Sequence, residues 1–252
     1  MKINMHTFHD ELSGIIDKLY DTQGANIEKA GEICGEAIEK GGVIQVFGSG
    51  HSIGFGLEMR NKAGSLYPIH QLLMNDFVKM GYTTLEDFKD MNNIFERRKG
   101  VAERLFKIYN IGPEDVFIII SNSGINGVVI DIAIEAKKAG HKIIVVTSWQ
   151  HTNSEKSRHA SGKKLYEFAD VVIDNCGPTG DALMPTDKIE KVASISSITG
   201  VIIGQTIELA ACEKLKADGY ELPVRRLEDS EENIAFNRRM EEKYEGRLNN
   251  EY

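Results

Sequence analysis

The sequence has few cysteines and no long apolar segment. Its three cysteines, Cys34, Cys176 and Cys212, are widely spaced and odd in number, so they form neither a zinc-knuckle pattern nor a disulfide framework. No apolar run reaches the ~18 residues that a membrane-spanning helix requires, and residues 1–6 lack the apolar core of a secretion signal. These absences predict a cytoplasmic protein with no membrane partner.

An excess of positive charge is missing as well. The 252 residues include 30 Lys and Arg against 38 Asp and Glu, so the formal net charge is −8, and no basic block occurs. This balance disfavours a nucleic-acid partner, but a few backbone N–H groups can still bind phosphate locally. Two nucleotide-binding motifs are also lacking: there is no P-loop lysine, and the loop Gly48–Ile53 lacks the third glycine of G-x-G-x-x-G.

Strand and helix patterns alternate along most of the chain. Helical patterns begin with two expected helices in residues 5–40 and end with a long one at 187–217. Short apolar runs typical of buried parallel strands lie between them, at residues 43–47, 66–69, 116–120, 142–146 and 170–174. This order predicts an α/β fold, a doubly wound sheet of five parallel strands with helices on both faces.

Length and composition suit one large domain with helical additions. We expect a single domain over residues 1–222, followed by a charged helical tail at 223–252. The thin apolar stripe of the tail leaves two alternatives, a solvated helix packed on its own domain or a strap across a dimer partner. Residues 70–93 are a candidate flap beside the substrate. Gly200 and Gly204, inside the long helix, indicate that another backbone approaches closely.

Two loops of small polar residues follow two of the predicted strands. The loop Ser121–Asn126 contains hydroxyls, amides and glycine but no charged side chain, and a helical pattern follows it. The loop Gly48–Ser52 has the same arrangement about seventy residues earlier. A helix N-terminus offers unpaired N–H groups and a positive dipole end, so such a loop can wrap a phosphate dianion. We expect both loops to converge on one ligand at the carboxyl edge of the sheet.

These loops, together with residues 133–140 and 144–148, resemble the SIS (sugar isomerase) domain family. The resemblance covers about residues 25–215 and is strongest on the phosphoheptose isomerase side of the family. Within it, residues 160–170 are similar to an uncharacterised bacterial group of stand-alone SIS proteins. The family implies a flavodoxin-like fold, a phosphorylated sugar as the ligand, and a homodimer or homotetramer.

The resemblance also implies roles for individual residues. Phosphate contacts are expected at Ser49, Ser52, Ser121, Asn122, Ser123 and Asn126. Aldose–ketose isomerisation needs a base that moves a proton between adjacent carbons and a group that helps to open the ring, and Glu58 and His51 are the candidates. Relatives carry a glutamate where this chain has Lys62 and a histidine where it has Glu58. They also carry a histidine on the late helix, which residues 188–217 lack, so we expect no metal site and no cofactor.

Most of these residues also have a structural explanation. Serine and asparagine cap helices, and Glu58 is spaced to pair with Lys62 at i, i+4. Ser148, Ser161 and Asp181 are candidate sugar contacts, although Ser161 could cap a helix and Asp181 could stabilise a turn. The sequence therefore predicts a sugar-phosphate isomerase acting between C1 and C2. An SIS-type lyase or etherase and a non-catalytic sugar-phosphate sensor are the alternatives.

Overall fold

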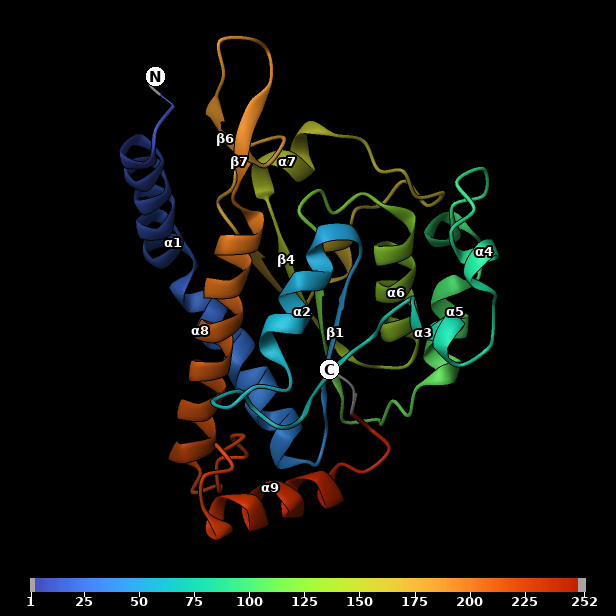
Figure 1. Ribbon diagram of the computed structural model, residues 1–252, viewed down its shortest axis with the longest axis vertical. Coiled ribbons are helices and arrows are strands. Elements are labelled where there is room, and N and C mark those ends of the chain that lie inside the picture. The colour runs from blue at the N-terminus through green and yellow to red at the C-terminus, as the bar shows by residue number, and fades with distance from the viewer. Residues whose placement is uncertain (1–2, 249–252) are drawn as a thin grey trace.

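A parallel sheet forms the centre of the molecule in the computed structural model, which describes residues 3–248 (Figure 1). Its strand order is β2-β1-β3-β4-β5. The strands are β1 (Ile44–Gly48), β2 (Ile69–Gln71), β3 (Val116–Ile120), β4 (Lys142–Thr147) and β5 (Val171–Asp174). All four pairings are parallel, which confirms the predicted α/β fold with a five-stranded sheet.

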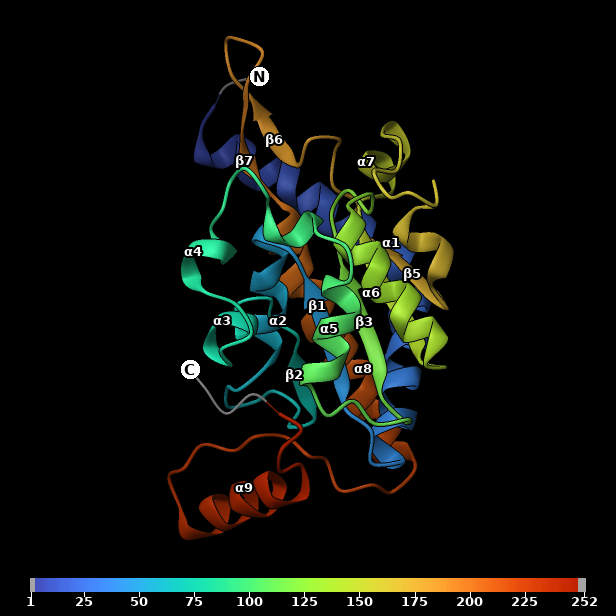
Figure 2. The same cartoon turned by 90° about the vertical axis from the view of Figure 1, so that its right-hand side faces the viewer.

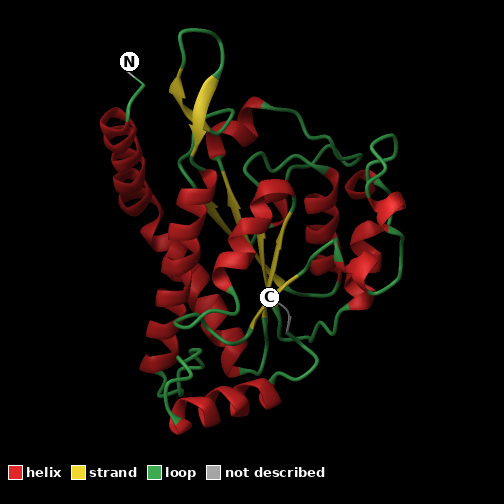
Figure 3. Ribbon diagram, in the orientation of Figure 1, coloured by secondary structure: helices red, strands yellow, loops and turns green. Residues whose placement is uncertain are grey.

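Helices cover both faces of the sheet, because successive strand residues point to opposite sides. Val46 and Ile118 face one side, whereas Phe47 and Phe117 face the other. Figure 3 shows the helices arranged around the strands. The first face is covered by α1 (Met5–Glu39), α2 (Ile53–Met59) and α8 (Ser196–Ala217), and the second by α5 (Val101–Ile108) and α6 (Gly127–Lys138). Each face of the sheet therefore has its own apolar core, formed by side chains of the buried strands and of the helices that cover them.

Helix α1 is continuous over 35 residues, so the expectation of two helices in residues 5–40 was wrong. The segment contains no proline, and its buried stripe packs along α8 (Figure 1). The two helices touch at Gly31, where an added Cβ would lie 2.3 Å from the Cβ of Ala210. Gly200 and Gly204 of α8 instead face side chains of Phe55, Met59 and Ile120, so the backbone of the sheet does not approach these glycines. Approach by a second subunit, the other alternative for these glycines, stays a prediction.

The segment between β2 and β3 contains three short helical pieces before α5. They are α3 (Asp76–Lys79), α4 (Leu85–Phe88) and a 3-10 turn at Phe95–Arg97. Phe77 is fully buried and its ring centroid lies 5.2 Å from that of Phe95. Strand β2 begins later than expected, at Ile69, and the preceding Leu66 forms an isolated bridge with Val224. Proline has no N–H to donate, which explains why the ladder starts after Pro68.

A β-hairpin replaces the first part of the expected helix at 187–217. Its strands, β6 (Ala182–Pro185) and β7 (Lys191–Ser194), pair antiparallel, and the N–H of Thr186 donates to the carbonyl of Glu190 at 3.0 Å. Helix α8 starts only at Ser196, whose N–H and hydroxyl both donate to the Asp181 carboxylate. The hairpin projects beyond the carboxyl edge of the sheet, and α7 (Trp149–Ser154) lies at the same end of the molecule (Figure 1).

The C-terminal helix α9 (Glu231–Lys243) lies at the opposite end of the molecule (Figure 2). Its buried Phe236 and Met240 form a small third core with Val43 and Tyr67. Part of the apolar stripe of the tail is thus covered by residues of the same chain, whereas Ile234 of the same helix is 39% exposed. Within residues 3–248 no helix combines the length and the apolar character needed to cross a membrane.

Candidate functional site

The first loop turns sharply at the end of β1 and leads directly into α2. A side chain at Gly48 would place its Cβ 2.6 Å from the Ser52 carbonyl oxygen, so the loop can fold back only on a glycine. Gly50 has φ +60, a conformation that glycine adopts without strain. The Ser52 N–H donates to the Ser49 carbonyl at 3.2 Å, closing a 3-10 turn. This geometry directs Ser52 and the start of α2 across the edge of the sheet.

The second loop is held in shape by the hydroxyl group of its own Ser121 and by that of Thr152 in α7. Ser121 is buried, and its Oγ accepts a hydrogen bond from the Gly124 N–H at 3.1 Å. Gly124 has φ +61 and lies against Thr147 and Thr152. The Thr152 hydroxyl donates to the Ser123 carbonyl at 2.7 Å. Ser121 therefore shapes the loop, and Ser123 is anchored through its main chain.

Asn122 connects the second loop to the end of β5. Its Oδ1 accepts from Asn175 Nδ2 at 2.9 Å, and its Nδ2 lies 3.3 Å from His151 Nδ1. Asn175 is itself fixed, because its Oδ1 accepts the Gly177 N–H at 2.9 Å. Asn175 was not among the residues predicted from the sequence. Its position directly after the last predicted strand, at the same edge of the sheet as the two loops, was the signal that could have indicated it.

The two loops meet in one pocket at the carboxyl edge, which we call the loop pocket. It is narrow, about 10 Å³, which is room for about one water-sized group. Its walls come from the first loop and α2, the ends of β3 and β5, and the start of α8: His51, Ser52, Phe55, Ile120, Asn122, Asn175, Ser196, Ser197 and Gly200. No lysine or arginine is among them, so polar recognition here depends on amides, hydroxyls, an imidazole and backbone N–H groups.

The N-terminus of α8 brings a helix dipole to this pocket. Asp181, with φ +70, accepts hydrogen bonds from the Ser196 N–H at 2.8 Å and from the Ser196 hydroxyl at 2.7 Å. Asp181 thus positions Ser196 and does not itself line the pocket. Residues 70–93, the candidate flap, contribute nothing to the lining either.

The candidate base Glu58 lies away from the loop pocket. It forms an ion pair with Lys62, the alternative that its i, i+4 spacing allows. The pair lies near Glu208 of α8, whose pKa rises to about 7 through burial, with Lys62 lowering it and Glu58 raising it. The other candidate, His51, is exposed and lines the pocket. Of the two proposed acid–base residues, only His51 lines the loop pocket.

Asn126 faces a different cavity on the other side of the second loop. It is the N-cap residue of α6, but its side chain makes no capping bond; its Oδ1 instead accepts from Arg158 Nη1 at 3.3 Å. The cavity has a volume of about 510 Å³. Its two arginines, Arg97 and Arg158, are balanced by Glu96 and Asp131, so its described lining carries no net formal charge that would select an anion.

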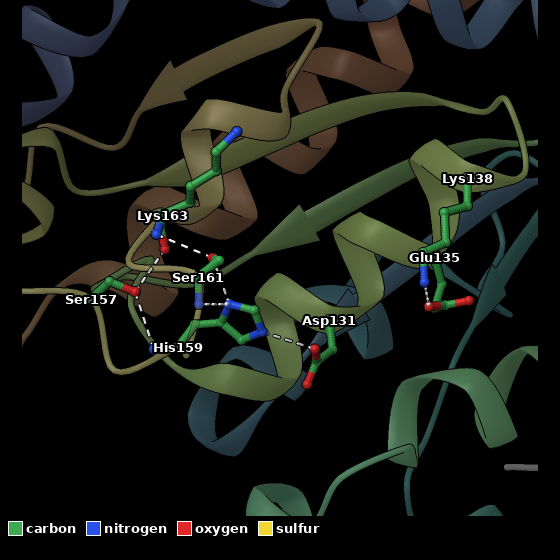
Figure 4. Close-up of polar contacts among 7 residues, drawn as sticks. All are labelled: Asp131, Glu135, Lys138, Ser157, His159, Ser161 and Lys163. Carbon is green, nitrogen blue, oxygen red and sulfur yellow. Dashed lines mark hydrogen bonds and ion pairs between the residues drawn. The ribbon is translucent and has the colours of Figure 1, made fainter.

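Ser148 and Ser161 also have internal partners. The buried Ser148 Oγ donates to the Gly177 carbonyl at 2.7 Å and accepts the His151 N–H at 3.1 Å, capping α7. Ser161 is exposed, and its Oγ lies 2.7 Å from His159 Nδ1 (Figure 4). Neither serine lines the loop pocket. Ser49 is half-buried at the start of the first loop and is likewise outside the lining.

Ser161, His159 and Asp131 form a hydrogen-bonded chain, with His159 Nε2 3.0 Å from Asp131 Oδ1 (Figure 4). The order resembles that of a nucleophilic triad. However, His159 Nδ1 also accepts the Ser161 backbone N–H at 3.1 Å, and Ser161 Oγ accepts the Lys163 N–H at 3.2 Å. These main-chain bonds occupy His159 Nδ1, the nitrogen that would act as a base, and the Ser161 hydroxyl. The three hydrogen-bonded residues therefore fasten the loop 157–163 to α6.

Comparison with known proteins agrees with this architecture. The SIS domain matches residues 7–148. A UPF0309 protein of Halalkalibacterium halodurans is 36% identical over 212 residues, covering 83% of this chain and 85% of the relative. A UPF0309 protein of Listeria monocytogenes is 35% identical over 243 residues, covering 96% and 97%.

A solved structure shares the fold. Phosphoheptose isomerase GmhA from Neisseria gonorrhoeae superimposes with a TM-score of 0.51 at 16% identity, over 84% of this chain and 96% of that one. No group of three or more His, Cys, Asp or Glu side chains within residues 3–248 has the geometry of a metal site.

The SIS domain match, which spans more than half of the sequence, and the long alignments to these relatives establish that the chain belongs to the SIS domain family.

Proposed function

We propose that this protein binds a phosphorylated sugar at the loop pocket and isomerises it by proton transfer between C1 and C2. One observation carries the proposal: His51 and Ser52 from the first loop and Asn122 from the second line the same pocket. Parallel α/β sheets bind ligands at this edge, outside the carboxyl ends of the strands. The solved structure that shares the fold is named as a phosphoheptose isomerase, which supports a phosphorylated sugar as the ligand.

The phosphate would sit at the mouth of the pocket, because the interior holds only about one water-sized group. His51 is exposed there and can turn outward without leaving a buried cavity. Donors would come from Ser52 and the Asn122 amide in the lining, from Ser123, which follows Asn122 outside the lining, and from the N-terminus of α8, whose dipole favours an anion. His51 would then lie beside the sugar and act as the acid–base group for ring opening or proton transfer.

A homo-oligomer is part of the same proposal. Large apolar side chains are exposed on α2, on α8 and at the tip of the hairpin: Leu57 at 52%, Leu209 at 68% and Ile189 at 98%. Apolar surface of this kind is typical of a face that another protein covers. A second copy packed on α2 and α8 would border the loop pocket, which both helices line. Sedimentation equilibrium tests this, since we expect a mass of at least twice 28.1 kDa.

The non-catalytic sensor is the second candidate, and one observation favours it. Glu58, the expected base, is paired with Lys62 and does not line the pocket. A sensor needs the phosphate loops but no base. The two functions differ in one measurable event, the exchange with solvent of the hydrogen next to the carbonyl carbon of the bound sugar, at C2 of an aldose or C1 of a ketose.

A thermal-shift panel of sugar phosphates and the matching free sugars tests the binding. A ligand at 100 times its Kd stabilises the folded chain by about 2.7 kcal/mol, which is about 5–10 °C in Tm for a protein of this size. We expect this shift with one or more phosphorylated sugars and not with their free forms. Equal shifts with both forms, or none with any phosphosugar, would refute the proposed site.

Catalysis is tested on the stabilising sugar in deuterium oxide. Proton abstraction next to the carbonyl carbon gives an enediol, which takes up deuterium at C1 when a ketose forms and at C2 when an aldose forms. NMR identifies the product as an isomer or as an elimination product. We expect an isomer labelled at C1 (ketose) or at C2 (aldose), and a His51→Asn variant that still binds but exchanges at least tenfold more slowly. Tight binding without exchange would replace the isomerase by the sensor.

A further inference from the structure

A cyclic hydrogen-bond network lies where β3, β4 and β5 end, next to the loop pocket. We call it the amide network, and its members are Asn122, Ser148, His151, Asn175 and Gly177. The Gly177 N–H donates to Asn175 Oδ1 at 2.9 Å, and Asn175 Nδ2 donates to Asn122 Oδ1 at 2.9 Å. Asn122 Nδ2 lies 3.3 Å from His151 Nδ1. The His151 N–H donates to Ser148 Oγ at 3.1 Å, and this hydroxyl donates to the Gly177 carbonyl at 2.7 Å, which closes the cycle.

The direction of the side-chain bonds follows from one backbone group. The Gly177 N–H can only donate, so the Asn175 amide must turn its oxygen toward Gly177 and its nitrogen toward Asn122. Asn122 then presents its oxygen to Asn175 and its nitrogen to His151. Reversal of either amide would place two donors face to face. His151 Nδ1 is therefore an acceptor, the hydrogen of the neutral imidazole is on Nε2, and both amides have one defined orientation.

Each of the two amides keeps one N–H that the network does not use. An amide nitrogen carries two hydrogens, and within residues 3–248 Asn122 Nδ2 and Asn175 Nδ2 each make one hydrogen bond. Both residues line the loop pocket, and Asn175 is only 1% exposed. Because buried polar groups are almost always paired, the occupant of the pocket is expected to bring an oxygen acceptor.

The size and charge of the pocket narrow the identity of that acceptor. Its volume of about 10 Å³ admits about one water-sized group, which a single phosphate oxygen matches and a whole phosphate does not. The described lining contains no carboxylate that would repel an anion, and Ser196 and Ser197 bring the positive dipole end of α8 to it. Two N–H donors that meet on one oxygen stabilise its negative charge in the same way as an oxyanion hole.

His151 acts on this arrangement from outside the pocket. It is half-buried on α7 and is not part of the lining. The terminal torsion of an asparagine side chain has a broad energy minimum, so a defined amide plane needs a partner at each end. Asn175 holds the oxygen of the Asn122 amide and His151 holds its nitrogen. Loss of the His151 acceptor would let this amide rotate about its one remaining bond, and its unused N–H would no longer have a fixed direction.

We propose that one phosphate oxygen of the ligand enters the loop pocket and accepts the unused N–H groups of Asn122 and Asn175, and that His151 is a positioning residue for this contact. The inference rests on the proposed function, because it names how the loop pocket recognises the phosphate of the sugar. The other phosphate oxygens and the sugar remain at the mouth of the pocket. Asn175 thereby becomes a ligand-binding residue, and His151 supports it without touching the ligand.

NMR titration of the isotope-labelled full chain with inorganic phosphate tests the amide contact apart from the sugar. In the side-chain amides of Asn122 and Asn175, the hydrogen outside the network should shift strongly and the hydrogen within it weakly, with one dissociation constant for both residues. Backbone responses at Ser52 and Ser123 without these side-chain shifts would overturn the contact and leave the phosphate loops in place. Absence of any response would overturn it as well, since a site that recognises the phosphoryl group must bind it without the sugar.

Two variants of nearly equal size test the role of His151. His151→Leu removes the acceptor, so phosphate should bind about fivefold more weakly. His151→Asn places Oδ1 where Nδ1 was, so its affinity should stay within twofold of the wild type. The control is Gln150→Leu, an exposed position of the same helix outside the network, which should match the wild type. Equal weakening in both His151 variants, or none in either, would overturn the positioning role. The proposed function fails separately, if phosphate binds to the two amides but no phosphosugar stabilises the chain.

Discussion

Replacement of the buried Glu208 by glutamine is expected to stabilise the protein above pH 7 and to have almost no effect near pH 4.5. Glu208 is 6% exposed on α8; its Oε2 accepts the Leu66 N–H at 2.8 Å, and its Oε1 is buried without a donor. Glutamine keeps an oxygen for the Leu66 N–H and removes the ionisable group. The substitution therefore isolates the cost of holding a carboxyl in this position.

The magnitude follows from the pKa. Burial raises the pKa of Glu208 from 4.5 to about 7, so the folded state holds this proton more tightly than the unfolded state. Stability then falls as pH rises between these values, by about 1.4 kcal/mol for each pH unit. The full loss is about 3 kcal/mol and is complete above pH 7. Glu208→Gln should escape this loss.

Differential scanning calorimetry between pH 4.5 and pH 8 measures the effect. For a protein of this size, 3 kcal/mol corresponds to a Tm about 6–12 °C higher for Glu208→Gln at pH 8, and the two proteins should converge at pH 4.5. Glu213→Gln, an exposed position of the same helix, is the control and should follow the wild type throughout. A Tm difference that does not change with pH would refute the argument.

Three further predictions concern the loops, the helix contact and the tail. Asn122→Asp adds a negative charge at the loop pocket but keeps the acceptor for Asn175. Equilibrium titration should therefore show phosphosugar affinity at least tenfold lower, with an unchanged Tm. Unchanged affinity would exclude this residue from the site. Gly31→Ala forces a Cβ against α8 and should cost about 1–3 kcal/mol in urea unfolding. Gly14→Ala, where nothing lies within 4 Å, should be neutral or stabilising, and equal losses in both would contradict the contact. Phe236→Ala empties part of the third core and should cost about 3–5 kcal/mol in the same assay, whereas no loss would show that α9 does not pack there.

The sheet was predictable because its strands are buried on both faces. Runs such as Val116–Ile120 are apolar at every position, and the order of strands and helices then allows few topologies. The meeting of the two loops follows from the same reasoning, since parallel strands end at one edge. These features depend on local composition and chain order, which are present in the sequence.

Other features depend on contacts between distant residues and could not be predicted. The Asn122–Asn175 bond joins positions 53 residues apart, and neither residue alone differs from an ordinary turn asparagine. The direction of Glu58 is set by how the short helix α2 packs on α8. The β6–β7 hairpin turns at Thr186–Glu190 without glycine, so the usual turn signal is missing.

The most direct test of the account is the backbone amide spectrum of the isotope-labelled protein, titrated with the sugar phosphate that stabilises it most. If one phosphate group is held between the two loops, the amides of Ser52 and Ser123 should shift together with a single dissociation constant, and Asn122→Asp should weaken both responses equally. Shifts confined to one loop, or different dissociation constants for the two, would show that the loops do not share a ligand.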